Sequence, residues 1–168
     1  LRKYGDERPV RIITDEDLDT EDPIYQDCKT PFEKYGTYPK IHLDKFLCFE
    51  HNIFLDSDIL CIGKTDHVWE LFRSNDQFVQ QLGRSANKLA SFVHGGVIYI
   101  NKPKINHKFF DFLRERFMDY KGSKSYKGSR TDQILYSAAF RTFQLKPLNI
   151  YKHPVMTVGF ECTDLPIN

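Results

Sequence analysis

The stretch "NIFLDSDILCIG", residues 52–63, is an apolar run interrupted by two aspartates, Asp56 and Asp58. The residues before Asp56 are typical of a buried β-strand. Carboxylates in such a place cost free energy unless a metal ion, a cation or hydrogen bonds compensate for the lost water. In open α/β sheets, ligands gather beyond the carboxyl ends of the strands. The stretch therefore predicts a core strand with a polar site at its end.

Outward from this stretch, strand-like and helix-like patterns alternate along the chain. Further strand patterns cover residues 9–14 and 95–101. Helical patterns cover residues 38–49, 67–72, 75–82, 107–120 and 131–140. Pro39 suits the first turn of one helix, Thr131 is a candidate cap of another, and Phe110, Leu113 and Phe117 share one helical face. The alternation predicts a layered α/β fold, and without a long linker we expect a single domain over residues 1–168.

Composition excludes some classes of protein and leaves others open. The chain has 168 residues with 24 basic and 23 acidic side chains, so its charge of +1 gives no support for a nucleic-acid partner. Four widely spaced cysteines and the lack of an Asn-x-Ser/Thr sequon favour the cytoplasm, with the Golgi lumen as the alternative. No apolar stretch approaches the roughly 20 residues that span a bilayer, so no membrane segment is expected. The oligomeric state is not encoded in these patterns.

Asp56 and Asp58 are candidate ligands of a divalent cation. Side chains two apart on a strand point the same way, and two such carboxylates can share Mn²⁺ or Mg²⁺ with the oxygens of a phosphate. The alternative is a turn at the strand end that carries two solvated acids. A bare Asp-x-Asp is common enough for this alternative to stay open.

Three segments together carry a resemblance. "YPKIHLDKFLCFEHNIFLDSDILCIGKTDHVWELF" (38–72), "FVHGGVIYIN" (92–101) and "RTDQILYSAAF" (130–140) resemble, in order, the core of the GT-A nucleotide-sugar glycosyltransferases. The similarity is greatest to family 8, the group of glycogenin and the lipopolysaccharide galactosyltransferases. It implies a GT-A-like, Rossmann-like mixed sheet flanked by helices. The positions that match the family are Tyr38, Lys40, Asp56, Asp58, Asp66 and Trp69 in the first segment.

Two parts of the family pattern are not evident in this sequence. The family's first strand and helix, which hold the uracil base, have no counterpart, and residues 1–14 resemble the end of that helix and the family's second strand. The family's final histidine motif, which supplies a third metal ligand, is also not found. His153 is the only late histidine and is therefore the candidate for that ligand.

The resemblance assigns roles to the residues around the aspartates. It implies that Asp58 binds Mn²⁺ or Mg²⁺ directly and that Asp56 contacts the metal or the hydroxyls of the UDP-sugar. Lys40 would contact the sugar or the diphosphate, and its alternative is a surface lysine on a solvated helix face.

Further roles fall on the second and third segments. Gly95 and Gly96 would let the backbone approach the sugar, with a β-bulge as the alternative. Asp132 and Gln133 would hold donor-sugar hydroxyls or face the reacting carbon. The alternative for Asp132 is a favourable charge at a helix N-terminus.

The resulting expectation is a metal-dependent enzyme that transfers a hexose from a UDP-sugar to a hydroxyl of a carbohydrate or protein-glycan acceptor. Retention of the anomeric configuration comes from the family likeness alone. Two alternatives stay open. One is a haloacid-dehalogenase-type phosphatase, which also carries Asp-x-Asp at a strand end, although Leu60 does not suit its motif. The other is a non-catalytic sugar-binding or partner-binding domain derived from a transferase.

Overall fold

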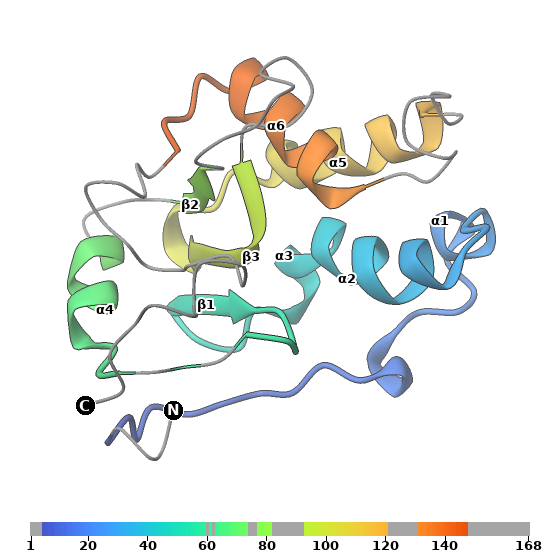
Figure 1. The fold of residues 1–168 in the computed structure, drawn as a ribbon. Helices are drawn as coiled ribbons and strands as arrows, with labels where there is room; N and C mark the ends of the chain where they lie inside the picture. Colours follow the sequence, from blue (N-terminus) through green and yellow to red (C-terminus); the bar gives the residue numbers. More distant parts are fainter. Residues whose placement is uncertain are drawn as a thin grey trace, which may run out of the picture.

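The structure is a computed structural model that describes residues 5–59, 61, 63–73, 77–81, 93–120 and 131–147, with the backbone alone for residues 77–81. It mixes helices and strands (Figure 1). The strands are β1 (His51–Leu55), β2 (Gln77–Gln81) and β3 (Val93–Asn101). The α-helices are α1 (Pro23–Gln26), α2 (Tyr38–Ile41), α3 (Leu43–Phe46), α4 (Asp66–Arg73), α5 (His107–Asp119) and α6 (Asp132–Thr142). The shorter turns are η2 (Asp15–Asp17), the π-helical η3 (Glu33–Thr37) and η4 (Lys102–Lys104).

The three described strands form a sheet in the order β1-β3-β2. Both pairings are antiparallel, from His51↔Asn101 to Leu55↔Val97 for β1 and β3. The predicted combination of strands and helices is confirmed. A mixed sheet is not shown by these three strands, because the chain returns from β1 to β3 in the opposite direction and β2 is also antiparallel to β3.

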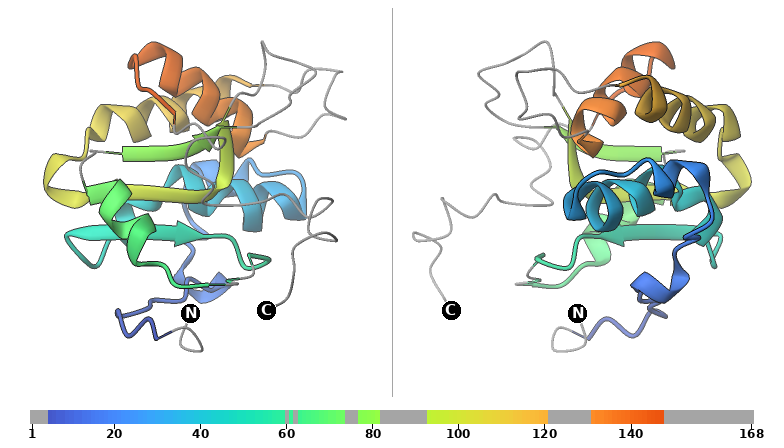
Figure 2. Two further views of the ribbon diagram at one scale, coloured as in Figure 1. Left: turned by 60° about the vertical axis from the view of Figure 1, so that its left-hand side comes forward. Right: turned by 90° about the vertical axis from the view of Figure 1, so that its right-hand side faces the viewer.

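Helices cover both faces of the sheet. Side chains alternate along β3, so this strand contributes to the packing on each face. Ile98 and Ile100 face the main core, which α2, α5 and α6 complete. Val97 and Tyr99 face the other way and pack against Phe72 of α4. Figures 1 and 2 show α4 on one side of the strands and the remaining helices on the other.

The helices α5 and α6 supply half of the largest fully buried side chains among the described residues. Phe110, Leu113 and Phe117 of α5 are fully buried, as their spacing predicted. The side chain of Asn106 caps α5 by accepting a hydrogen bond from the Lys108 N–H at 3.1 Å. Thr131 lies at the N-cap of α6, as predicted. Its side chain, however, makes no capping hydrogen bond.

Three predictions of local structure are wrong. Residues 9–14 are not a β-strand; their backbone pairs with no other strand of the described residues, and Val10 and Ile12 are exposed. Residues 75–82 are not helical, because Gln77–Gln81 pair with β3, and long-range pairing overrides a weak local preference. The helix expected over 38–49 is interrupted at His42 and ends at Phe46.

Among the described residues, no helix is both long enough and apolar enough to cross a membrane. The described cysteines, Cys28, Cys48 and Cys61, form no disulfide with one another.

Candidate functional site

Lys40 lies between two carboxylates that come from distant parts of the chain. Its Nζ donates to Asp132 at 2.8 Å and lies 2.9 Å from both carboxylate oxygens of Asp56. The side chains of Lys40 and Asp132 are 10% and 5% exposed, whereas that of Asp56 is 27% exposed. The alternative of a surface lysine is therefore wrong. A buried ammonium shared by two carboxylates is the centre of the candidate site.

Each of these residues comes from a different part of the fold. Lys40 is in the short helix α2, whose first turn contains Pro39 as predicted. Asp56 directly follows β1, and its N–H donates to the carbonyl oxygen of Gly96 at 3.0 Å, which extends the ladder by one pair. Asp132 begins α6. The end of the strand and the start of the helix thus meet at the lysine.

Gly95 lets the backbone of β3 approach Asp132. A Cβ at this position would overlap Oδ2 of Asp132 and would lie 3.5 Å from Nζ of Lys40. A larger residue would thus displace the Asp132 carboxylate. The alternative of a bulge also holds, because the β2–β3 register jumps from Val79↔Ile98 to Gln80↔His94 and leaves residues 95–97 without partners on β2.

Hydrogen bonds hold α2 in place, including the backbone of Lys40. The hydroxyl of Tyr136, on α6, donates to the carbonyl oxygen of Lys40 at 2.8 Å. The hydroxyl of Tyr38 donates to Asp22 at 3.2 Å, and Nδ1 of His42 lies 3.0 Å from the carbonyl oxygen of Tyr38. Since a carbonyl only accepts, Nδ1 of His42 carries the proton.

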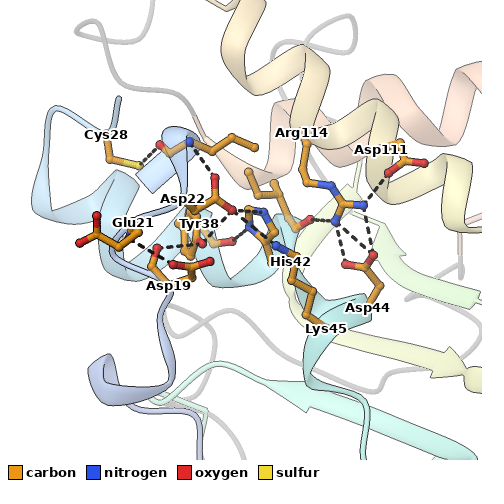
Figure 3. Close-up of polar contacts among 12 residues, drawn as sticks. Asp19, Glu21, Asp22, Cys28, Tyr38, His42, Asp44, Lys45, Asp111 and Arg114 are labelled. Atoms are coloured by element: carbon orange, nitrogen blue, oxygen red, sulfur yellow. Dashed lines mark hydrogen bonds and ion pairs between the residues drawn. The ribbon is translucent and has the colours of Figure 1, made fainter. Parts of the chain in front are cut away.

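Figure 3 shows the charged residues that hold α2 and α3 in place. Asp22 caps α1 and lies 3.4 Å from both Nε2 of His42 and Nζ of Lys45. Arg114 of α5 binds both carboxylate oxygens of Asp44, with contacts of 2.9–3.2 Å. The Arg114–Asp44 and Lys45–Asp22 contacts fix the segment that carries Lys40 before any ligand is considered.

The charges of the site perturb one another. Burial acts to lower the pKa of Lys40, but Asp132 and Asp56 more than offset it, so this pKa is raised and the ammonium is retained. Burial raises the pKa of Asp56; Lys40 opposes this, and Asp132 and Asp58 add to it. Burial lowers the pKa of His94, which lies near Lys40 and the carboxylates of Asp56, Asp58 and Asp132. Three carboxylates and one ammonium therefore meet near His94.

A cavity of about 660 Å³ opens beside the site. Lys40, Asp56, Ser57 and Asp58 line one end of it, and Asp6 and Trp69 also contribute. Asp58 is exposed, because the chain turns after Leu55 and the Ile59 N–H bonds the Asp56 carbonyl oxygen at 3.1 Å. The strand alternation used to place both aspartates on one side therefore does not extend to Asp58.

The residues present fit a divalent cation that arrives with a phosphate ligand. Among the described residues no group of three or more His, Cys, Asp or Glu side chains could hold a metal ion by itself. Mg²⁺, however, typically binds one or two carboxylates together with substrate phosphates and water. Asp58 offers such a hard oxygen donor at the cavity, whereas the oxygens of Asp56 already contact Lys40.

The other predicted residues have varied outcomes. Gln133 is half-buried in the first turn of α6, next to Asp132. Trp69 stacks under the Arg8 guanidinium, 4.9 Å from the ring centroid, and Asp66 pairs with Arg8 at 2.9 Å. His153 lies outside the described residues, so its assignment as a metal ligand stays a prediction.

Sequence reasoning missed two contributors to the site. Tyr136, which clamps Lys40, looked like one more core aromatic residue. Arg8 bonds Asp6 at 2.8 Å and lines the cavity, and the side chain of Thr65 also bonds Asp6. With these contacts, Arg8 lowers the pKa of Asp6 to about 2 although burial opposes it. No local pattern links residues 6–8 to residues 65–69.

A comparison with models of known protein families finds no family that matches the chain, and no curated protein matches its sequence.

Proposed function

We propose that the protein is a metal-dependent glycosyltransferase that transfers a hexose from a UDP-sugar to a hydroxyl acceptor. The observation that carries the proposal is the Lys40 ammonium between Asp56 and Asp132, beside the cavity that Asp58 lines. The resemblance to the GT-A glycosyltransferases names all four of these residues. Three of them converge in the fold although Lys40 and Asp132 are 92 positions apart in sequence.

The charge balance of the site supports a cationic cofactor. Three carboxylates, those of Asp56, Asp58 and Asp132, stand against the single ammonium of Lys40. Asp56 and Asp132 share the Lys40 ammonium, which leaves the exposed carboxylate of Asp58 available to a cation. Mn²⁺ or Mg²⁺ bound through Asp58 would supply that charge and, with a nucleotide present, would neutralise the charge that builds on the departing diphosphate.

The chain's own residues would bind and orient the donor. Carboxylates accept hydrogen bonds from sugar hydroxyls, so Asp56 and Asp132 would hold the hexose with Gln133 beside them. Lys40 holds both carboxylates in place through its ammonium. Gly95 leaves the space in which Asp132 lies, and His94, whose Nδ1 accepts from the Gly96 N–H at 3.1 Å, presents a neutral ring next to these charges.

The finer features of the proposal rest on the resemblance. These are the GT-A-like arrangement of the whole domain, retention of the anomeric configuration, His153 as a further metal ligand, and a carbohydrate or protein-glycan acceptor. A related alternative is a domain that binds the donor without transferring its sugar.

The test is calorimetric titration of UDP into the full chain with and without Mn²⁺. Binding is expected to require Mn²⁺ and to fall by roughly tenfold or more in Asp58→Ala. Asp119→Ala is the matched control, since Asp119 is an exposed carboxylate at the end of α5, away from the cavity. Its titration should be indistinguishable from that of the parent chain.

Turnover separates the remaining possibilities. Release of UDP from UDP-glucose or UDP-galactose, dependent on Mn²⁺ and lost in Asp58→Ala, supports the transferase. Metal-dependent UDP binding without turnover in an acceptor screen favours a binding domain. Hydrolysis of a phosphomonoester with no affinity for UDP, or UDP binding that is unchanged in Asp58→Ala, would overturn the proposal.

A further inference from the structure

The edge of β1 that faces away from β3 carries backbone groups that no other described strand pairs with. In an antiparallel ladder, alternate residues direct both N–H and C=O to the same neighbour. Asp56 N–H bonds the Gly96 carbonyl and Lys102 N–H bonds the Glu50 carbonyl, so the even-numbered residues of this segment face β3. His51, Ile53 and Leu55 therefore direct their backbone groups outward, where no strand pairs with them in the described part of the chain.

The same edge borders the cavity beside the Lys40 site. Asn52, Ile53, Phe54 and Leu55 line it along the strand, and residues 9–13 line it from the other side. Figures 1 and 2 show this N-terminal segment passing beside β1 on the side away from β3. The cavity is therefore a groove with a β-strand edge along one wall and an extended segment along the other.

The groove also gathers exposed apolar side chains. Seven large hydrophobic residues are exposed among the described residues, and all except Met118 line this groove. They are Val10, Ile12, Phe32, Tyr35, Phe49 and Leu55, and Ile12 reaches 77% exposure. Contiguous exposed apolar surface of this kind marks an interaction site.

We propose that this groove binds an extended peptide strand from a separate polypeptide, which pairs with the free edge of β1. The outward N–H and C=O groups of His51, Ile53 and Leu55 demand an occupant with complementary backbone groups at the same spacing, which a β-strand provides. The apolar walls demand apolar side chains at alternate positions of that strand. The proposal does not require the proposed transferase activity, although the β1 edge and the Lys40 site open on the same cavity.

The shape of the groove disfavours a second copy of this chain as the occupant. Residues 9–13 stand opposite β1, so the occupant must be a single slender strand over this length. The β1 edge of a second copy faces the same segment of its own chain. Two such edges cannot meet unless both segments move away.

The experiment uses the full chain and a display library of random peptides about ten residues long, the upper range of natural strands. Selected peptides should carry apolar residues at alternate positions. In hydrogen exchange, a selected peptide should protect the amides of Ile53 and Leu55, which exchange faster than those of Asn52 and Phe54 in the free chain. Ile12→Asp should weaken binding by roughly tenfold or more, since it places a charge in an apolar wall.

Two controls keep the result specific. Met118→Asp, at an exposed apolar residue outside the groove, should leave peptide binding unchanged. Ile53→Pro removes an outward N–H and leaves the ladder to β3 intact, so it should abolish binding in a chain that still unfolds cooperatively.

Three outcomes would overturn the proposal. The first is a selection that enriches no alternating peptide. The second is protection of the Ile53 and Leu55 amides in the chain alone, which would mean that the edge is already paired. The third is concentration-dependent dimerisation, measured by sedimentation and lost in Ile12→Asp, which would assign the groove to a second copy.

Discussion

The core beneath α5 and α6 and the groove along β1 are built from similar side chains but differ in exposure. Phe109, Phe110 and Phe140 are at most 1% exposed. In the groove, Phe32 and Tyr35 are 51% and 57% exposed. Aromatic content alone therefore does not reveal which part of this chain is closed. The difference arises because α5 and α6 cover the core, whereas β1 has a neighbour on one edge alone among the described strands.

Lys40 lies at the boundary between these regions. Its backbone is clamped in the core by Tyr136, and its side chain reaches the carboxylates at the end of the groove. A site at such a boundary combines a rigid support with access to ligand. Substitutions in the core, at Lys40 and at His42 test how much the two regions differ in their contribution to the free energy of unfolding.

The largest effect is expected from Phe110→Ala. Removing a fully buried aromatic side chain leaves a cavity, and the free energy of unfolding should fall by about 3–5 kcal/mol. Phe32→Ala, the matched change in the groove, should cost less than about 1 kcal/mol because half of that side chain is already in water. Urea unfolding followed by circular dichroism measures both. Equal losses would mean that the groove is as closed in solution as the core.

The second prediction compares Lys40→Met with Lys45→Met. Losing the Lys40 ammonium leaves the carboxylates of Asp56 and Asp132 without their cation, so the free energy of unfolding should fall by about 3 kcal/mol. This is the lower end of the range for a broken buried ion pair, because water reaches Asp56. Lys45 is 51% exposed and pairs with Asp22, and its replacement should cost about 1 kcal/mol or less. Similar losses would show that the Lys40 cluster is solvated.

The elements that were predicted correctly from the sequence are those in which the hydrophobic pattern matches the burial seen in the structure. β1, β3, α5 and α6 lie within a few residues of the expected segments, since hydrophobic period and burial coincide there. Residues 9–14 have the composition of a strand but pair with no other strand in the described part of the chain. Residues 77–81 have a partner, β3, that no local pattern reveals.

The candidate site was predicted in part. Asp56 stands out from its sequence alone, as a charge at the end of an apolar strand. Its connection to Lys40 and Asp132 depends on the packing of α2 and α6 around β3, so the residues by themselves do not reveal it; the family resemblance grouped them. Arg8 and Tyr136 match no motif that was recognised. Their roles depend on contacts with residues far away in sequence.

The smallest effect concerns His42, which links the helices that hold Lys40. Burial, opposed in part by the hydrogen bond to the Tyr38 carbonyl, lowers the pKa of His42 below its ordinary value of 6.5. Lys45 and Arg114 act in the same direction as burial, and Asp22 acts against it. The unfolded chain therefore takes up this proton first. The stabilisation is complete above about pH 6.5 and is lost as the pH falls through the pKa of the folded state.

His42→Gln should make the loss of stability just below pH 6.5 shallower, as measured by urea unfolding at a series of pH values. Burial also lowers the pKa of His94, so part of the loss of stability below pH 6.5 remains in His42→Gln. Asp22 affects stability in a separate, more acidic pH range. Burial acts to raise the pKa of Asp22, but the Ile24 N–H, His42 and Tyr38 outweigh burial and lower this pKa below 3.8. His67→Gln, at an exposed position of α4, should leave the profile unchanged. If His42→Gln matches that control, the imidazole is open to water and the α2–α3 segment is held by Arg114 and Tyr136 without it.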